Sequence, residues 1–194
     1  MPQGAKPRLR QIGRRLKKAA AWFGARSGSA AIEFALVAPV FFLFLLGTLE
    51  TGLIFFGDFV LQNATNDAAR QIRTGQVALS NMSQADFKKM ICTGISPLLV
   101  DCDTKLQIDV QSFTSFSAVN LGNPITSSGA LDPSLKNWQT GTVCSIVLVR
   151  SFYTYDVVTP LLTPFLVNVN STQHLFTAAA AFRNEPYTTA VSGC

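Results

Sequence analysis

Residues 34–49 read FALVAPVFFLFLLGTL, a stretch without a single charge. After Glu50 the apolar sequence resumes as TGLIFFG, so that 24 residues separate Glu33 from Asp58. At about 1.5 Å per residue, a helix of this length extends roughly 36 Å, which exceeds the roughly 30 Å hydrocarbon core of a bilayer. A buried core helix is the alternative, but a helix that is apolar on every side needs more surrounding protein than a small domain supplies. The sequence therefore predicts a single transmembrane helix over residues 29–57.

Charge is distributed unevenly around this span. Half of the 16 basic residues precede residue 29, where no acidic residue occurs, whereas the rest of the chain has a net charge of −3. A basic head, an apolar stretch and an acidic body are typical of a single-span protein whose head stays in the cytoplasm. We therefore expect residues 1–28 to form a basic cytoplasmic leader. Because the excess of positive charge lies in this leader and the rest of the chain is mildly acidic, we expect no nucleic-acid partner.

The junction between leader and span carries a distinct motif. Residues 26–34 read RSGSAAIEF, so Gly28 is followed five residues later by Glu33 and then by the aromatic Phe34. A glycine leaves the backbone around the next peptide bond unobstructed, as a protease needs. A glutamate that enters hydrocarbon costs a few kcal/mol, so Glu33 calls for a partner of opposite charge. The simpler interpretation is that Glu33 marks the membrane edge at a helix N-terminus, where the macrodipole favours an acid.

This motif resembles the GxxxxEF signal that prepilin peptidases recognise, with cleavage after Gly28 and Ser29 as the new first residue. A cleaved secretory signal also begins basic and turns apolar, but its apolar region is usually only about 7–15 residues long. The sequence AAIEFALVAPVFFLFLLGTLETG, followed by LQNATNDAARQIRTG, looks like the TadE-like pseudopilins of the tight-adherence, or Flp-type, pilus. The resemblance covers residues 26–77 and, more weakly, residues 173–187, which contain AFRNEPY.

The resemblance implies a minor pilin that takes part in biogenesis or assembly of a Flp-type pilus. It places the protein in the bacterial inner membrane, with its C-terminal domain in the periplasm. The partners that it implies are prepilin peptidase, other pilins and Tad assembly components. It also implies that Glu33 pairs with the α-amino group of a cleaved neighbouring subunit. The alternative is an uncleaved, signal-anchored periplasmic protein that binds pilus or envelope components without entering a filament.

Glu50 is the second acid of the span, roughly 25 Å beyond Glu33 along a helix. We expect it near the outer face of the membrane. It either pairs with a basic group of another subunit, as an intramembrane assembly contact, or reaches interfacial water. The residues alone favour neither interpretation.

Beyond Asp58 the helix is expected to continue. An apolar stripe at helical spacing runs to a terminating glycine, Gly75, which predicts a helix from Ser29 to Thr74 whose extracytoplasmic part covers residues 58–76. The stripe consists of Leu61, Ala64, Ala68 and Ile72.

Residues 77–194 are expected to form a periplasmic α+β domain. Ser83 resembles a helix cap in front of Phe87, Met90 and Ile91. Three later segments are rich in β-branched, aromatic or alternating apolar residues and predict a small antiparallel sheet on the outer half of the long helix. They are 106–110, 143–155 and 175–182. Residues 119–141, rich in Gly, Asn, Ser and Pro, predict an exposed loop.

The four cysteines all follow the span. In an oxidising compartment an even number suggests two disulfides, for which three pairings exist. We expect Cys92 to pair with Cys102 and Cys144 with Cys194. Zinc is the alternative, but the chain has no C-x-x-C pair and a single histidine.

No catalytic motif accompanies His174. The sequence contains no GxSxG, no HExxH and no phosphate-binding glycine loop. We therefore expect no enzyme activity, no cofactor and no small-molecule substrate.

Overall fold

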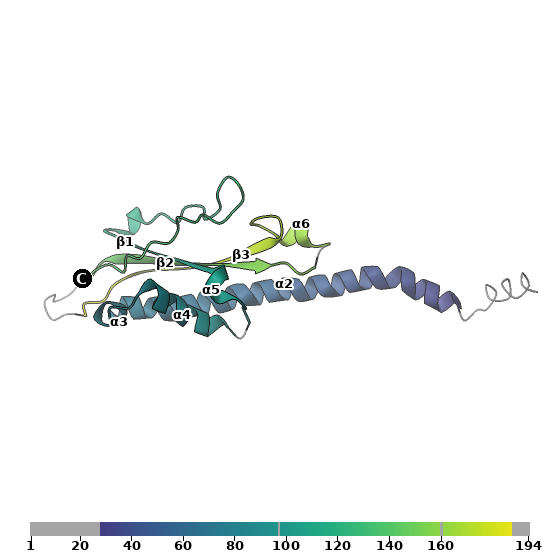
Figure 1. Cartoon of the computed structure of the whole chain (residues 1–194), viewed down its shortest axis with the longest axis horizontal. Coiled ribbons are helices and arrows are strands. Elements are labelled where there is room, and N and C mark those ends of the chain that lie inside the picture. The colour runs from purple at the N-terminus through teal and green to yellow at the C-terminus, as the bar shows by residue number, and fades with distance from the viewer. Residues whose placement is uncertain (1–27, 97, 160, 188–194) are drawn as a thin grey trace, which may run out of the picture. The chain divides into compact units, whose positions relative to one another are not determined.

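The computed structural model describes residues 28–96, 98–159 and 161–187 (Figure 1). A long apolar N-terminal helix and a small three-stranded antiparallel sheet confirm the predicted α+β class. The chain divides into two compact units, Met1–Leu46 and Gly47–Cys194. In chain order the elements are α2 (Ser29–Arg73), α3 (Gln76–Leu79), α4 (Gln84–Ile95), α5 (Cys102–Lys105), β1 (Leu106–Phe113), η2 (Phe116–Ala118), β2 (Ile146–Asp156), α6 (Thr163–Leu166) and β3 (Gln173–Arg183).

Helix α2 is 45 residues long and ends one residue before the predicted Thr74. Its last turn carries Arg70 and Arg73, whose charge is favourable beside the negative end of the helix dipole. The predicted terminating glycine, Gly75, has a φ of 77°, in the left-handed region that other residues rarely adopt. The end of the helix is thus set by the sequence, as predicted.

From residue 50 onward, one side of α2 is buried under the rest of the second unit. The buried positions recur at intervals of three or four residues, as expected for one helix face. They are Glu50, Ile54, Gly57, Leu61, Thr65, Ala68, Ala69 and Ile72. Of the predicted apolar stripe only Ala64 is incompletely buried. Gly57 allows close packing, since a Cβ there would lie 2.5 Å from the Phe176 ring.

Helix α4 covers α2 beside the sheet. It begins as predicted, because the Ser83 hydroxyl accepts a hydrogen bond from the Asp86 N–H. Phe87, Ile91 and Ile95 are fully buried in the core. The helix therefore contributes one apolar face, and its exposed face carries polar residues.

The sheet is a meander in the order β1-β2-β3. Strand β2 is central and pairs with β1 through Val149 opposite Val110 and with β3 through Val149 opposite Ala180. Alternate residues of each strand face helices α2 and α4, and they build the main hydrophobic core together with those helices. The three predicted strand segments are therefore confirmed.

The second face of the sheet is covered by the segment that was predicted to be an exposed loop. Residues 119–141 lack regular structure, but many of them are only half exposed. Ile125, Leu131 and Leu135 pack against a second apolar cluster formed by Phe152, Val169 and Leu175. The predicted loop is confirmed, since the segment has no helix or strand and none of its residues is buried. Its half-exposed residues also shield sheet residues whose side chains point away from α2, which the sequence did not indicate.

Candidate functional site

The predicted cleavage site lies at the start of helix α2. Gly28 and Ser29 are exposed, and among the described residues no atom comes within 4 Å of a Cβ placed on Gly28. The Ser29 hydroxyl donates a hydrogen bond of 3.0 Å to Glu33 Oε1. Glu33 and Phe34 are exposed as well. The four residues of the motif therefore form one accessible surface at the head of the helix.

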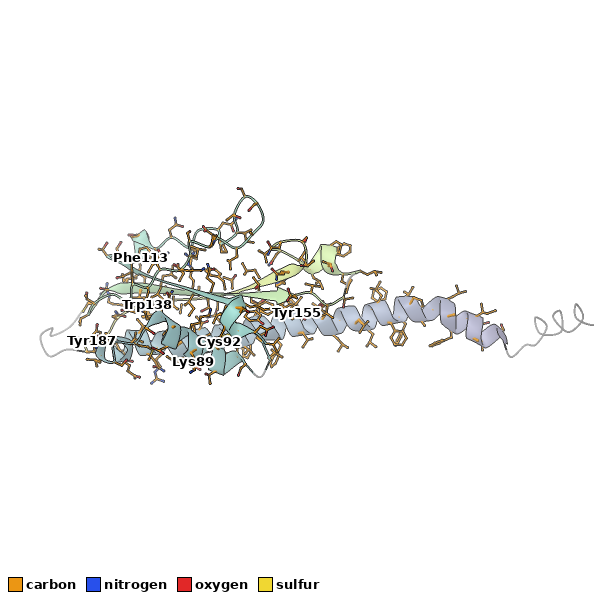
Figure 2. The ribbon with its side chains drawn as sticks, viewed as in Figure 1. Lys89, Cys92, Phe113, Trp138, Tyr155 and Tyr187 are labelled. Atoms are coloured by element: carbon orange, nitrogen blue, oxygen red, sulfur yellow. A yellow bond between two sulfur atoms is a disulfide. The ribbon has the colours of Figure 1, made fainter. Side chains whose placement is uncertain are left out.

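An exposed apolar surface follows this motif along α2. In the described part of the chain, α2 is the one helix that is long and apolar enough to cross a membrane. Figure 2 shows its side chains standing out from the ribbon. The large apolar residues that stay exposed are Ile32, Phe34, Leu36, Val37, Val40, Phe41, Phe42, Phe44, Leu45, Leu46, Leu49, Leu53, Phe55, Phe56 and Phe59. A surface of this size and composition fits lipid better than water.

Glu50 has hydrogen-bond partners within its own chain, which its sequence position did not indicate. Only 4% of the residue is exposed, and its carboxylate accepts hydrogen bonds from two backbone N–H groups within the same chain. Val158 N–H donates to Oε1, and Thr159 N–H donates to Oε2 at 2.8 Å. The acid therefore connects the segment after β2 to helix α2 within the chain. Its role as an intramembrane assembly contact stays a prediction.

Comparison with known proteins finds a family match in the region that contains the motif and helix α2. Residues 28–70 match the model of a family described as TadE-like protein. The chain carries a TadE-like segment. This confirms the resemblance predicted from the motif and the span, and the matched residues begin at Gly28 and include Glu33, Phe34 and Glu50. No curated protein and no solved structure matches the chain.

The C-terminal end of helix α2 contacts residues near the C-terminus of the chain. Glu185 N–H donates to the Arg73 carbonyl at 2.8 Å, and its carboxylate lies 3.2 Å from Arg73 Nε. A Cβ on Gly75 would lie 2.2 Å from the Tyr187 ring. The sequence NEPY, noted only as a weak resemblance, thus closes the last turn of α2, where carbonyls lack helical partners.

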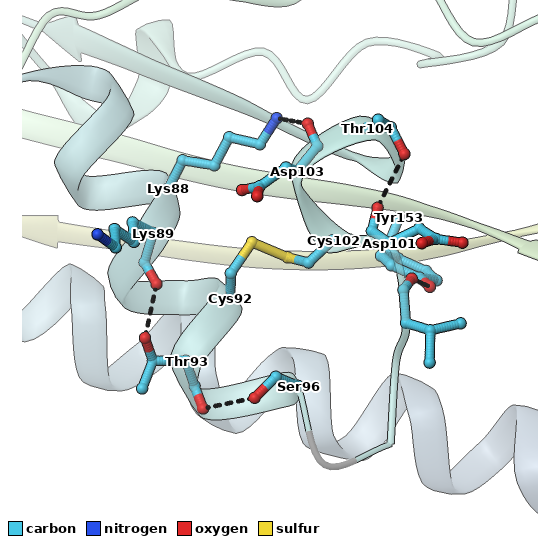
Figure 3. The surroundings of a disulfide bond; sticks show 11 residues. Lys88, Lys89, Cys92, Thr93, Ser96, Asp101, Cys102, Asp103, Thr104 and Tyr153 are labelled. Carbon is cyan, nitrogen blue, oxygen red and sulfur yellow. Dashed lines mark hydrogen bonds between the residues drawn. A yellow bond between two sulfur atoms is a disulfide. The ribbon is translucent and has the colours of Figure 1, made fainter.

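A disulfide joins Cys92 of α4 to Cys102 at the start of α5 (Figure 3). This is the pair that the sequence analysis proposed. Beside it, Lys88 Nζ donates to the Asp103 carbonyl at 2.7 Å, which also connects the two helices. Cys144 is disulfide-bonded as well, whereas Cys194 lies outside the described residues. The pairing of Cys144 with Cys194 therefore stays a prediction.

We expect the thiols of the native protein to be oxidised. Alkylation with iodoacetamide, without reductant, should label none of the four cysteines, because a disulfide sulfur is not a nucleophilic thiolate. Intact mass spectrometry measures the number of labels. The control is alkylation after reduction in denaturant, which should add four labels. Four labels on the unreduced protein would contradict both disulfides and favour a reduced or metal-bound state.

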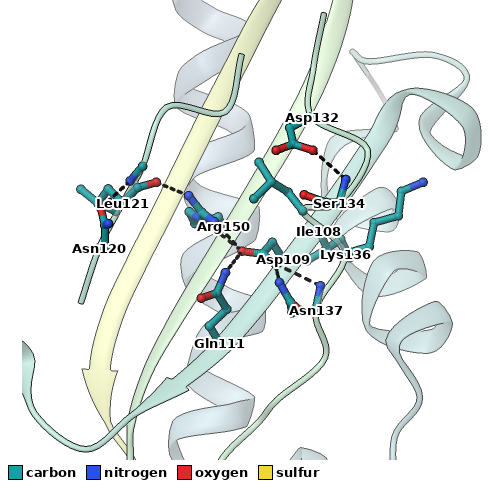
Figure 4. A network of polar contacts seen from close by, with 12 residues as sticks. Ile108, Asp109, Gln111, Asn120, Leu121, Asp132, Ser134, Lys136, Asn137 and Arg150 are labelled. Atoms are coloured by element: carbon teal, nitrogen blue, oxygen red, sulfur yellow. Dashed lines mark hydrogen bonds and ion pairs between the residues drawn. The ribbon is translucent and has the colours of Figure 1, made fainter. Parts of the chain in front are cut away.

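A buried ion pair lies on the covered face of the sheet (Figure 4). Arg150 Nη2 lies 2.7 Å from Asp109 Oδ2, and Arg150 also donates to the Leu121 carbonyl. Asn137 donates to Asp109 Oδ1 from its backbone N–H at 3.0 Å and its side chain at 2.7 Å. Gln111 Nε2 donates to Oδ2 at 2.8 Å. The pair therefore ties residues 121 and 137, in the covering segment, to two strands.

The hydrogen bonds determine the charge state of Asp109. Burial raises the pKa of this carboxyl, but hydrogen bonds from Arg150, Asn137 and Gln111 lower it more, so that its pKa lies below the usual value. The sequence analysis did not predict this pair. Asp109 and Arg150 become neighbours only through the pairing of β1 with β2, which connects residues 41 positions apart.

The remaining polar candidates show no shared site. His174 contacts the Leu166 carbonyl through Nδ1 and packs against Phe176 with ring centroids 5.6 Å apart. Within residues 28–96, 98–159 and 161–187, no group of three or more His, Cys, Asp or Glu side chains is arranged to hold a metal ion. The features that stand out are the exposed motif, the apolar helix surface and the contacts around Glu50.

Proposed function

We propose that the protein is a minor pilin, or pseudopilin, that prepilin peptidase cleaves after Gly28 and that takes part in biogenesis or assembly of a Flp-type, tight-adherence pilus. The observation that carries the proposal is the position of the GxxxxEF motif. It lies exposed at the head of an apolar helix, inside a TadE-like segment. A peptidase can reach the Gly28–Ser29 bond there, while the helix that follows remains in lipid.

The proposed topology follows from charge and redox chemistry. Residues 1–28 stay in the cytoplasm as a basic leader, because positive charge is retained on that side of a membrane. Residues 29–57 cross the bacterial inner membrane, and residues 58–76 continue the helix outside it. Residues 77–194 form the periplasmic domain. The Cys92–Cys102 disulfide supports this orientation, since disulfides persist in oxidising compartments such as the periplasm.

Cleavage would change the charge at the head of the helix. Hydrolysis of the Gly28–Ser29 bond leaves an α-amino group on Ser29, which is mostly protonated at neutral pH because its reference pKa is about 8. Glu33 lies one helical turn away and is exposed. The carboxylate is therefore available to an ammonium group of a neighbouring subunit, and this pairing would remove two charges from contact with lipid.

Detection of the mature N-terminus tests the proposal most directly. The full chain is expressed with and without its cognate peptidase, and the membrane fraction is analysed by intact mass and N-terminal peptide mapping. We expect Ser29 as the first residue when the peptidase is present and Met1 when it is absent. Retention of Met1 in both samples would favour the uncleaved, signal-anchored alternative.

We expect Glu33→Ala to be processed but to assemble poorly. The scissile bond is unchanged, whereas the new α-amino group loses its acceptor on a neighbouring helix. An unmet buried polar group costs about 1–3 kcal/mol, and more if it stays charged. Membrane insertion should survive, because the change makes the segment more apolar. The measurement is co-purification of the processed protein with pilin partners, together with a blot of the membrane fraction.

Ser29→Ala is the matched control for this change. It removes the hydroxyl that bonds to Glu33 Oε1 but keeps both the carboxylate and the new α-amino group. We expect partner recovery close to that of the wild type. If Glu33→Ala recovers partners as well as this control does, Glu33 only marks the membrane edge.

A further inference from the structure

The segment between β2 and β3 has an unusual composition. Residues 157–168 read VVTPLLTPFLVN, with no charge in twelve residues. Its large apolar side chains point outward: Val158 is 76% exposed, Leu161 is 69% exposed and Phe165 in α6 is 82% exposed. A periplasmic loop gains nothing from presenting such side chains to water, since their transfer out of water is favourable. The segment therefore calls for an apolar partner.

Contacts fix this segment beside a particular part of helix α2. Leu162 packs over Gly47, where a Cβ would lie 2.6 Å from the leucine Cδ1. Glu50 accepts hydrogen bonds from Val158 N–H and Thr159 N–H. Both anchoring positions belong to the proposed span, so the segment lies at the level of residues 47–50 of the helix.

The helix surface at this level is also apolar and exposed. On the side of α2 that the second unit leaves uncovered lie Leu49, Leu53, Phe55, Phe56 and Phe59. Glu50 is the only charged residue between Glu33 and Asp58, and it is buried. The outward surface around residues 47–56 thus has no charge, and the apolar segment contacts the helix at this same level.

We propose that residues 157–168 enter the interfacial layer of the outer leaflet and give the domain a second contact with the membrane. The inference rests on the proposed span, because the helix brings the segment to the depth at which lipid is available. Apolar side chains in the acyl boundary with polar groups near the headgroups are typical of interfacial segments. Thr159, Thr163 and Asn168 supply such polar groups here. A protein partner is the less favoured occupant, since the segment contacts the helix at Gly47 and Glu50, within the proposed span.

In this arrangement Glu50 has a structural role in the membrane contact. Two backbone N–H groups of the segment would otherwise enter the interface without acceptors, which is costly in a medium poor in water. The carboxylate satisfies both and is itself shielded from lipid by the segment. Glu50 therefore provides the acceptors that the loop backbone needs, and the loop keeps the Glu50 carboxylate away from lipid.

A depth measurement tests the proposal on the full chain in vesicles of phosphatidylethanolamine and phosphatidylglycerol. Single cysteines are introduced as Leu161→Cys and Phe165→Cys, labelled without reductant with an environment-sensitive NBD fluorophore, and quenched with spin-labelled lipid. Leu79→Cys, at a side chain 67% exposed in α3, is the aqueous control. Leu36→Cys, 74% exposed on α2, reports the span itself. Labelled wild-type protein sets the background.

We expect probes at Leu161 and Phe165 to be quenched at least half as strongly as the probe at Leu36, with blue-shifted emission, while the probe at Leu79 is not quenched. If the Leu36 probe is quenched and the two loop probes behave like Leu79, the inference is overturned and the span stands. If none of the probes is quenched, the proposed membrane anchor fails, and the inference fails with it.

Discussion

Gly28→Val should leave a species that retains the 28-residue leader when the cognate peptidase is present, whereas the wild type loses it. The expected effect is close to complete, because the residue before the scissile bond must fit the protease and a β-branched side chain crowds the backbone there. Among the described residues no atom lies within 4 Å of a Cβ placed on Gly28, so the substitution meets no steric clash with them. Immunoblotting and intact mass of the membrane fraction measure the outcome.

Gly52→Val is the matched control. Gly52 is an exposed glycine of the same helix, and no atom lies within 4 Å of a Cβ placed on it. The same change in side chain should therefore leave processing intact. If wild type and Gly28→Val migrate alike and both retain Met1, the proposal of a processed pilin fails, and the signal-anchored alternative takes its place.

Much of the fold could be predicted because its signals are local. The span is a continuous apolar run, the end of α2 is set by Gly75, and the cap of α4 requires only Ser83 and the residues that follow. The three strands likewise follow from their own composition. Each of these features depends on residues close together in the chain, so one sequence is enough to detect them.

The contacts that were missed connect residues far apart in the chain. Glu50 is satisfied by backbone N–H groups of Val158 and Thr159, which no side-chain pattern identifies. Residues 119–141 have the composition of an exposed loop. Their few apolar side chains nevertheless pack on the second face of the sheet, because its apolar residues would otherwise be exposed to water. Both features depend on tertiary contacts that composition does not encode.

The Asp109–Arg150 pair shows why that cover matters for stability. The two residues are cross-strand neighbours, and their side chains are 0% and 6% exposed. Removing one partner of a buried ion pair leaves the other charge without compensation in a medium of low dielectric constant, at a cost of about 3–5 kcal/mol. Arg150 would keep its hydrogen bond to the Leu121 carbonyl and its place over the Phe152 ring, but neither carries a negative charge. The pair therefore connects the sheet to the segment that covers it through hydrogen bonds to Leu121 and Asn137.

We accordingly expect Asp109→Ala to lower the free energy of unfolding by about 3–5 kcal/mol. Urea unfolding of the full chain in detergent, followed by near-ultraviolet circular dichroism, measures the change. Glu185→Ala is the control, because it removes an ion pair with Arg73 in which both side chains are about half exposed, and such a pair contributes about 0–1 kcal/mol. Equal losses in the two variants would contradict a special role for the buried pair. The double change Asp109→Leu with Arg150→Met should recover stability, since apolar replacement of both partners removes the uncompensated charge.

The pH dependence of stability follows from the lowered pKa of Asp109. A carboxyl whose pKa is lower in the folded protein than in the unfolded chain contributes stability that is present above the unfolded value, about 3.9, and is lost as pH falls through the folded value. Wild-type stability should therefore decline more steeply below about pH 4 than that of Asp109→Asn, which cannot titrate at this position. Parallel pH profiles for the two proteins would show that the carboxylate is not held in its charged form by Arg150, Asn137 and Gln111. A flatter profile for Asp109→Asn, together with its lower stability at neutral pH, would assign this part of the acid sensitivity to the buried network.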